Sequence, residues 1–334
     1  MQVSFANLID LAAEGVGGKV LWCNDEFFAE AENLIKPGRG VFIAGKFTER
    51  GKWMDGWETR RRRTPGHDSA VIALGLPGVI RGFNIDTNHF LGNMPEYASV
   101  DACELPPGQT PPLDQSSPDG RVWTEIVPRT KLLGGTQNYV PVSSDRRWTH
   151  LRLNIYPDGG VARFRVHGEV RPDIEALRGQ GRVDLASAAL GGTVVQANDS
   201  FFSTKDNLIL PGRAENMGGG WETRRKRVPG FDWIVVKLAV PGIIEQVEVD
   251  TSHFKGNYPD TCSLEGVRLD AQVLDFANAE GLPWQELLPK SKLQAHTQHL
   301  FEKELLAKGP FTHVRLNIFP DGGVSRLRLF GRPA

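Results

Sequence analysis

The stretch HLRLNIYPDGGV, residues 150–161, occurs a second time as HVRLNIFPDGGV, residues 313–324, with ten of twelve positions identical. Before the PDGG sequence every second residue is aliphatic, and this alternation is typical of a β-strand with one buried face. PDGG supplies tight-turn residues, after which a strand pattern resumes. We therefore expect residues 150–156 and 161–166 to form a hairpin, and the second copy to repeat it.

Two further polar strings are repeated. GWETRR at residues 56–61 returns unchanged at 220–225, and DTNHFLGNMP at 86–95 returns as DTSHFKGNYP at 250–259, with seven of ten positions identical. A duplicated fold requires only its turns and hydrophobic pattern, because cores accept apolar exchanges of similar volume. Here the apolar positions drift while Glu, Asp, His, Arg and Asn are kept. This contrast indicates shared chemistry or a shared polar network.

The register of the repeat shows where the two copies differ in length. Asn24 corresponds to Asn198, 174 residues later, while Gly56 corresponds to Gly220, 164 residues later. The first copy therefore carries ten extra residues, located roughly between Phe42 and Asp55. A period this long exceeds that of solenoid repeats and matches a whole domain.

We expect a first domain at 1–170, a linker rich in charge and helix breakers at 171–181, and a second domain at 182–334. Short strand patterns dominate, for example residues 68–74 and 79–86, which we expect to pair antiparallel because few residues separate them. Many short strands with Gly and Pro turns and few helices predict an all-β protein. The predicted fold is two tandem jelly-roll β-sandwich domains that arose by internal duplication.

The composition is ordinary for a globular protein, with 40% hydrophobic residues, 24% charged residues and a net charge of −1. This balance predicts no nucleic-acid partner, and no apolar run is long enough to predict a membrane partner. The first residues, MQVSF, have no basic segment followed by an apolar run, so we expect no secretory signal. Cys23, Cys103 and Cys262 have no paired spacing and predict free thiols in the cytoplasm.

Asp86 and His89, with their counterparts Asp250 and His253, come at the end of a predicted strand and in the loop beyond it. Loops at the end of a rigid sandwich often carry function. An aspartate that fixes a histidine tautomer makes a competent general base, and the same pair could ligate a metal. An Asx-type turn with a structural histidine accounts for the pattern equally well. The residues alone leave both interpretations open.

His150, Arg152 and Asn154 are spaced to share one face of a strand. An imidazole, a guanidinium fork and an amide in one patch suit substrate binding. A merely solvated strand face is the alternative, and it would be preferred for a single copy. The identity of all three residues in the second copy favours function; they are His313, Arg315 and Asn317.

The GWETRR motif places Glu58 and Arg60 on one side of an extended segment, repeated as Glu222 and Arg224. An arginine can anchor a carboxylate substrate while the glutamate acts as acid or base. A surface ion-pair network, which contributes little to stability, is the alternative.

Several histidines occur in one copy only. His67 is replaced by Phe231, His167 has no counterpart, and His296 and His299 belong to the second copy alone. A function that both halves share cannot use these residues, whereas a function confined to one half could.

The repeated strings GWETRR, DTxHFxGN and HxRLNIYPDGG resemble those of the allantoicase (allantoate amidinohydrolase) family. The resemblance covers both repeats and essentially the whole chain. It implies two jelly-roll domains of the galactose-binding-like type, a homo-oligomer, and hydrolysis of allantoate to ureidoglycolate and urea, a step in purine and allantoin degradation.

This reaction assigns expected roles to the repeated residues. Arg60 or Arg152, or Arg224 or Arg315 in the second copy, would clamp the substrate carboxylate, and Asn154 or Asn317 would hold the ureido groups. Departing urea needs a proton donor and the attacking water needs a base. We predict Glu58 or His150 as acid and His89, oriented by Asp86, as base. The second-copy counterparts Glu222, His313, His253 and Asp250 are expected to be equivalent.

The need for a cofactor stays open. Asp and His in one loop would suit Mn²⁺ or Zn²⁺, but the sequence requires no metal and gives no complete ligand set. The competing function is a non-catalytic carbohydrate- or small-ligand-binding module, because the same fold hosts both. The weight on Glu, Asp, His and Arg favours the enzyme, and the intact polar strings argue against a degenerate relative. Whether one repeat, both repeats or a site between domains is catalytic is not fixed by the sequence.

Overall fold

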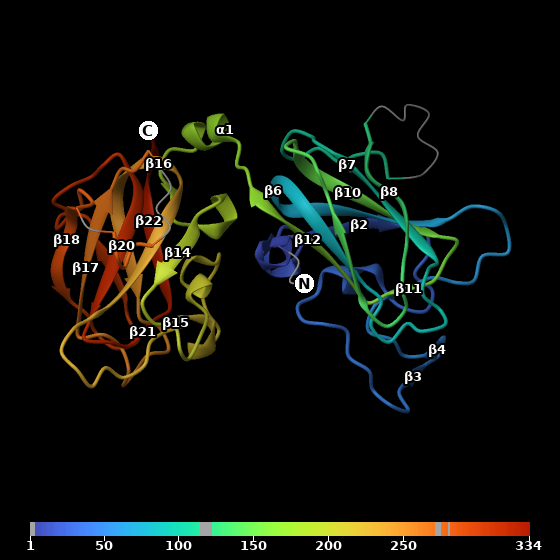
Figure 1. Cartoon of the computed structure of the whole chain (residues 1–334), viewed down its shortest axis with the longest axis horizontal. Helices are drawn as coiled ribbons and strands as arrows, with labels where there is room; N and C mark the ends of the chain where they lie inside the picture. The colour runs from blue at the N-terminus through green and yellow to red at the C-terminus, as the bar shows by residue number, and fades with distance from the viewer. Residues whose placement is uncertain (1–3, 114–121, 271–274, 280) are drawn as a thin grey trace. The chain divides into compact units, whose positions relative to one another are not determined.

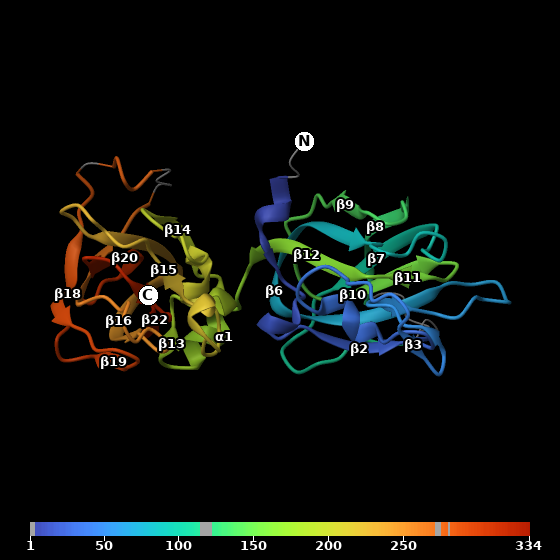
Figure 2. The same cartoon turned by 90° about the horizontal axis from the view of Figure 1, so that it is seen from below.

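The computed structural model describes residues 4–113, 122–270, 275–279 and 281–334. The chain divides into two compact units, Met1–Arg171 and Pro172–Ala334. Strands make up most of the regular secondary structure of each unit, as Figures 1 and 2 show. Among the described residues, no helix is long and apolar enough to cross a membrane.

The first unit contains three 3-10 helices and twelve strands among its described residues. They are η1 (Ser4–Asn7), β1 (Ile9–Asp10), η2 (Glu14–Val16), β2 (Lys19–Cys23), η3 (Ala31–Ile35), β3 (Phe47–Thr48), β4 (Gly51–Lys52), β5 (Trp57–Glu58), β6 (Asp68–Asp86), β7 (Tyr97–Cys103), β8 (Thr124–Lys131), β9 (Gln137–Pro141), β10 (Arg147–Tyr156), β11 (Gly160–Val161) and β12 (Arg163–Val170).

The second unit repeats this order from its own α-helix onward. Its elements are α1 (Ile174–Gly179), β13 (Val183–Asp184), η4 (Ala188–Leu190), β14 (Thr193–Ala197), η5 (Lys205–Ile209), η6 (Met217–Gly219), β15 (Trp221–Glu222), β16 (Asp232–Asp250), β17 (Thr261–Val267), β18 (Gln285–Lys292), β19 (Gln298–Phe301), β20 (Phe311–Phe319), β21 (Gly323–Val324) and β22 (Arg326–Pro333). The expected linker contains α1, which Asp173 caps by accepting from the Ala176 N–H, and it falls with the second unit from Pro172 onward.

Strand β6 extends through both layers of the first unit. Its first half pairs with β2 and β10, and its second half pairs with β9 and β12. Along β10 the partner changes from Gly78 to Ala73 between Trp148 and His150, so β6 bends in between. The expectation that residues 68–74 and 79–86 pair with each other is wrong, because they are consecutive parts of this one bent strand.

The expected hairpin is also wrong. β10 pairs with β6 and β7, whereas β12 pairs with β6 and β1, so the two strands flank different halves of β6. The PDGG turn carries the chain from one layer to the other, and it forms the short strand β11, which pairs with β5. An alternating pattern cannot tell a hairpin from this crossing, because both need only a turn.

The bend in β6 brings its two ends to the same end of the unit. Ile155 lies opposite Asp68 and Arg163 lies opposite Asp86, and the short PDGG turn joins these two partners. The second unit has the same pairings in β16, where Ile318 lies opposite Asp232 and Arg326 lies opposite Asp250. The repeated polar strings therefore gather at one end of each unit.

The core lies between the two layers. The side chains of Leu151, Leu153 and Ile155 are fully buried, which confirms the predicted alternation of β10. The largest fully buried side chains include Trp57, Trp148, Phe83, Phe90, Phe164, Trp221, Phe254 and Phe311. Such side chains stabilise a fold by about 25 cal/mol for each Å² of apolar surface removed from water.

The second glycine of PDGG is explained by packing. A Cβ at Gly160 would come 2.0 Å from the Phe90 ring, and a Cβ at Gly323 would come 2.0 Å from Phe254. A Cβ at Gly56 would likewise come 2.7 Å from the Phe90 ring. The three repeated strings therefore contact one another, and these glycines fix how closely they approach.

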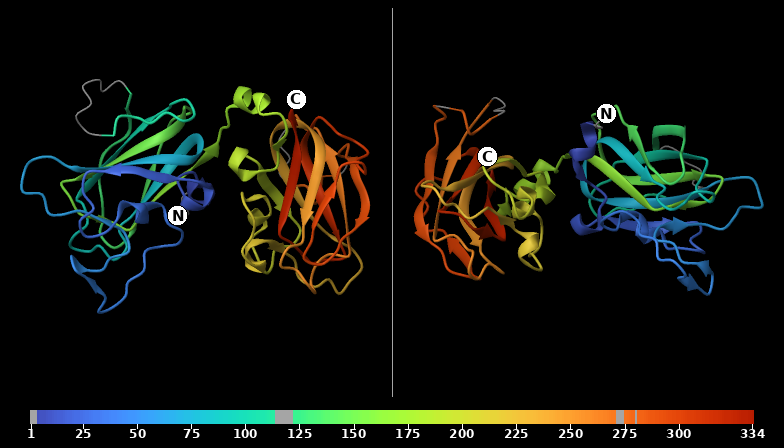
Figure 3. Two further views of the ribbon diagram at one scale, coloured as in Figure 1. Left: turned by 180° about the vertical axis from the view of Figure 1, so that it is seen from behind. Right: turned by 60° about the horizontal axis from the view of Figure 1, so that its bottom comes forward.

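The predicted insertion in the first copy is confirmed. It contains the small β3–β4 pair, and the blue segment that carries it extends away from the other strands of the first unit in both views of Figure 3. The second unit has the short η6 at this place. Asp55, at the end of the insertion, pairs with the buried Arg163 at 2.9 Å and so ties the insertion to β12.

Candidate functional site

The structure separates the predicted site residues of each repeat into two groups. Around the loop that follows β6 lie Arg39, Glu58, Asp86, His89 and Asn93, which we call the loop group. On the outer face of β10 and β7 lies a cavity lined by His67, Ser99, Asp101, Glu125, Arg152, Asn154 and Tyr156, which we call the sheet-face cavity.

Asp86 is almost completely buried at the end of β6, and it binds an arginine. Its carboxylate accepts from Arg39 Nε at 2.8 Å and Nη2 at 3.0 Å, and from the Asn88 backbone N–H at 3.0 Å. The predicted contact by which Asp86 orients His89 is not formed, because the carboxylate faces Arg39 and closes an Asx-type turn. Asp250 accepts one hydrogen bond from Arg213 Nη1 at 2.9 Å and one from the Ser252 N–H at 2.7 Å, and the fork of Arg213 also binds Glu248.

His89 is exposed, and its backbone is left-handed, with φ of 69°. Its ring lies 5.7 Å from the ring of Phe42 in the insertion. His253 has the same backbone conformation, with φ of 73°, and its Nε2 lies 2.9 Å from the Ala214 carbonyl oxygen. Two non-glycine residues at positive φ in equivalent positions indicate a loop shape that both repeats keep.

Glu58 pairs through β5 with Gly160, which places its side chain beside the repeated loop. Its Oε1 accepts from Asn93 Nδ2 at 2.7 Å, and Glu222 accepts from Asn257 at 2.6 Å. Burial raises the pKa of Glu58, and the Asn93 hydrogen bond opposes this effect. A carboxyl group with a raised pKa is better suited to donate a proton near neutral pH.

Arg60 and Arg224 are held outside both groups. The Arg60 Nε donates to Asp25 at 2.9 Å, and the Arg224 Nε donates to Asp199 at 2.8 Å. Both guanidinium groups also lie over phenyl rings, Arg60 over Phe27 at 5.3 Å and Arg224 over Phe201 at 5.0 Å. Arg60 lines a second, more open hollow of about 340 Å³.

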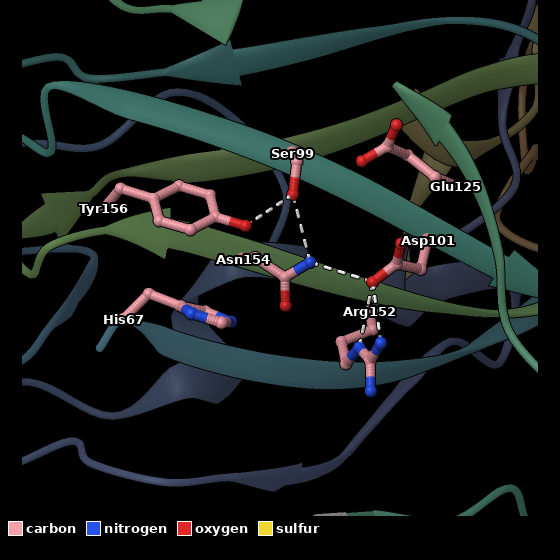
Figure 4. A pocket seen from close by; sticks show the side chains of 7 residues that line it. All are labelled: His67, Ser99, Asp101, Glu125, Arg152, Asn154 and Tyr156. Atoms are coloured by element: carbon pink, nitrogen blue, oxygen red, sulfur yellow. Dashed lines mark hydrogen bonds and ion pairs between the residues drawn. The ribbon is translucent and has the colours of Figure 1, made fainter. Parts of the chain in front are cut away.

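The register of β10 against β7 builds the sheet-face cavity. Arg152 lies opposite Asp101, and Asn154 lies opposite Ser99, so all four side chains share one face. The cavity has a volume of about 180 Å³, and Figure 4 shows Asn154 between the imidazole of His67 and the Asp101 carboxylate.

Arg152 is held at a fixed angle in the sheet-face cavity. Its Nε and Nη2 donate to Asp101 Oδ2 at 3.0 and 2.9 Å, and its guanidinium lies 5.0 Å from the Trp123 ring. Among the described residues, no protein acceptor is bonded to Nη1. The fork can therefore offer donors to an anionic ligand.

A chain of hydrogen bonds crosses the floor of this cavity (Figure 4). Asn154 Nδ2 donates to Asp101 at 2.9 Å and to Ser99 Oγ at 3.1 Å, and Ser99 Oγ lies 3.0 Å from the Tyr156 hydroxyl. The ring of Tyr156 packs on His67, with centroids 4.7 Å apart. The polar groups of the cavity are thereby pre-positioned.

His150 lies beyond the residues that line the cavity. Its Nδ1 is 2.8 Å from the Thr149 hydroxyl, and burial lowers the pKa of its imidazole. His313 is bonded in the same way to Thr312 at 2.9 Å, and burial followed by the Lys237 charge lowers its pKa to about 4. Both rings are neutral near pH 7, so they are poor proton donors.

Sequence reasoning missed Ser99, Asp101, Glu125 and Tyr156. A signal was available, because Ser99 and Asp101 alternate on β7 and recur as Ser263 and Glu265. An Asp-to-Glu change does not stand out in a comparison that searches for identities.

Among the described residues, no group of three or more His, Cys, Asp or Glu side chains is arranged to hold a metal ion. In the loop proposed as a metal site, Asp86 binds Arg39, and Asp250 binds Arg213.

Comparison with known proteins agrees with this architecture. The allantoicase repeat family matches residues 9–171 and 183–334. A probable allantoicase of Pseudomonas aeruginosa (strain UCBPP-PA14) is 50% identical over 98% of this chain and 97% of its own length. Probable allantoicase 2 of Burkholderia pseudomallei is 50% identical over 98% of this chain and 95% of its own length.

The fold agrees with a solved structure as well. The crystal structure of allantoicase from Saccharomyces cerevisiae superposes with a TM-score of 0.75 at 34% identity, covering 98% of this chain and 94% of that chain. The two-sandwich fold and the internal duplication are therefore confirmed. By its two matched repeats and its near full-length relatives, this chain is a member of the allantoicase family.

Proposed function

We propose that this chain hydrolyses allantoate to ureidoglycolate and urea, as part of purine and allantoin degradation. Family membership over both repeats supports this activity. One observation supports a location for this activity in the molecule. In the sheet-face cavity, the guanidinium of Arg152 is held by Asp101 beside the amide of Asn154.

The substrate's chemistry matches this donor set. Allantoate carries one carboxylate and two ureido arms on a single carbon. The guanidinium of Arg152 would bind the carboxylate, since charge-assisted hydrogen bonds of an arginine fork are among the strongest in proteins. The hydroxyl and amide groups of Ser99 and Asn154 would hold the carbonyl and N–H groups of a ureido arm.

The reaction breaks the bond between the central carbon and one ureido nitrogen, and a water oxygen takes its place. The departing nitrogen gains a proton to become urea, and the water loses one, so an acid and a base are needed. The assignment of Glu58 as acid and His89 as base stays a prediction. The raised pKa of Glu58 supports it, whereas a neutral His150 is the weaker candidate for the acid.

We also propose a cytoplasmic homo-oligomer. Three free cysteines, Cys23, Cys103 and Cys262, support a reducing compartment. Support for self-association comes from the insertion, where exposed apolar side chains gather: Val41, Phe42, Ile43 and Phe47. Light scattering on the wild type and on Phe47→Asp tests this, and equal masses at the monomer value would contradict it.

The test of function is urea release from allantoate by the purified protein, with and without prior chelator treatment. We expect urea in the untreated run. Release in both runs argues against an essential exchangeable metal, and release only in the untreated run makes the Asp86 and Asp250 loops metal candidates again. No urea from folded protein with manganese restored would favour the ligand-binding alternative.

A further inference from the structure

We infer that the first repeat alone hydrolyses allantoate, and that His67 and Tyr156 make its sheet-face cavity competent for the reaction. This inference rests on the proposed function and deepens it, because it assigns the chemistry to one of two similar sites.

Both repeats keep the frame of the site. Arg315 donates to Glu265 as Arg152 does to Asp101, and Asn317 donates to Ser263 and Glu265 at 3.2 and 3.0 Å. The Arg315 guanidinium also lies over a tryptophan, Trp284, at 4.8 Å. We call the arginine, its acidic partner and the asparagine the clamp. The clamp is present in both repeats and therefore does not distinguish them.

The groups that face this clamp do distinguish them. In the first repeat the imidazole of His67 packs on the phenol of Tyr156 at 4.7 Å. In the second repeat the same two positions are Phe231 and Phe319, with ring centroids 4.9 Å apart. The pair keeps its packing and loses every group that can donate or accept a proton.

A third difference concerns the asparagine. Asn154 Oδ1 accepts from the Ser69 hydroxyl at 2.8 Å, and Ser69 lies opposite Asn154 in the sheet. The residue opposite Asn317 is Trp233, and Asn317 Oδ1 is buried without a partner among the described residues. The hydrogen-bond network is thus complete in the first repeat, whereas in the second it has lost a member at considerable energetic cost.

The first repeat's pair can perform both proton transfers inside the cavity that holds Arg152. Glu58 and His89, the acid and base predicted from the sequence, belong to the loop group, so we place the two roles on Tyr156 and His67 instead. His67 would take a proton from the attacking water as its oxygen bonds to the central carbon. Tyr156 would give its hydroxyl proton to the ureido nitrogen as the carbon–nitrogen bond breaks, and return of the proton from His67 to Tyr156 restores both residues. Burial, then the charges of Arg152 and Arg62, lower the pKa of His67 against the opposing effects of Asp68 and Asn154, which favours the neutral base.

Reciprocal exchanges between the repeats test the inference. We expect His67→Phe and Tyr156→Phe each to lower kcat for urea release by about 100-fold or more, the size of an acid–base contribution. Both variants should fold, because the second repeat holds phenylalanine at these positions in the same frame. The reverse changes, Phe231→His and Phe319→Tyr, should leave kcat within about threefold, well below that contribution.

Binding gives a second readout that a structural role would not produce. N-carbamoylglycine keeps the carboxylate and one ureido arm but has no second nitrogen on its α-carbon. Because both repeats keep the arginine and asparagine, we expect calorimetry to show two sites per chain, one of them lost in Arg152→Gln and both kept in His67→Phe. A kcat within tenfold of wild type in both His67→Phe and Tyr156→Phe would overturn the inference.

Failure of the proposed function is a separate outcome. If the folded wild type releases no urea, hydrolysis by either repeat is ruled out. Urea release by the wild type that survives in both His67→Phe and Tyr156→Phe instead leaves the proposed function standing and rejects only its assignment to this pair in the first repeat.

Discussion

The side-chain amide of Asn93 donates to Glu58 at 2.7 Å, and burial nevertheless raises the pKa of that carboxyl group. A raised pKa in the folded state means that the stability contributed by Glu58 is fully present below its unfolded pKa and is lost as the pH rises through the folded value. We therefore expect Glu58→Gln to be more stable than wild type at pH 7 and no more stable at pH 4, as measured by denaturant unfolding. A gain at pH 4 of equal size would contradict this origin.

The same variant tests the role of Glu58. Glutamine retains the Oε1 acceptor for Asn93 but has no proton to give. If Glu58 is the general acid, urea release should fall by about 100-fold or more. A fall of less than tenfold, with Glu222→Gln behaving alike as the matched variant, would remove Glu58 from the chemistry.

The left-handed backbone at His89 and His253 predicts an unusual order of stabilities. Alanine at such a position costs roughly 1–2 kcal/mol relative to glycine, which tolerates positive φ. We expect His89→Gly to be more stable than His89→Ala, and His253→Gly more stable than His253→Ala, by thermal unfolding. Measured alongside, kcat reduced by less than tenfold in both alanine variants would exclude these histidines as bases.

Arg39 and Arg213 should differ in their importance for stability. Arg39 neutralises one buried carboxylate, Asp86, whereas Arg213 binds two, Glu248 and Asp250. Removing the partner of a buried charge costs up to about 3–5 kcal/mol, and less when the partner is itself half-exposed, as both Arg39 and Arg213 are. We expect Arg39→Ala to lose about 2 kcal/mol by this reasoning, and Arg213→Ala to lose more.

Chemical denaturation of the two variants measures the difference. Each loss should appear in the transition of the repeat that carries the change. Equal losses of stability would contradict this expectation. They would show that the second carboxylate bound by Arg213 adds nothing to the cost of removing the arginine.

The lowered pKa of His313 predicts how the stability of the fold depends on pH. Its pKa in the fold is about 4, below the ordinary value of 6.5, so the unfolded chain binds the proton more tightly between these values. Stability should therefore fall as the pH drops from about 6.5 to 4. His313→Phe should flatten this dependence, because its ring cannot be protonated. An unchanged slope in an unfolding series over this range would contradict the assignment.

How much of this could be predicted from the sequence differs from feature to feature. The duplication, the buried face of β10 and the insertion all follow from local patterns, and the structure confirms them. The two strand pairings failed, because β6 bends and is shared by both layers. A bent strand and a hairpin have the same sequence pattern, in which two apolar runs are separated by a short segment that contains Gly and Pro.

The candidate site shows a similar division. Arg152 and Asn154 can be singled out from the sequence, because both recur in the second repeat. The partners of Arg152 and the proton-bearing pair were missed because they differ between repeats, as in Asp101 and Glu265 or Tyr156 and Phe319. Asp86 looked like a partner for His89 because they are close in sequence, but its actual partner, Arg39, is brought to it only by the fold.

Sharing β6 between the layers has a consequence for how each repeat opens. Neither layer can separate without breaking hydrogen bonds to this strand, since its two halves are central to different layers. Each repeat is thus expected to exchange its amide hydrogens as a single foldon, with the slowest exchange along β6 and β16. The duplicated chain would then contain two such foldons, one built around each of these long strands.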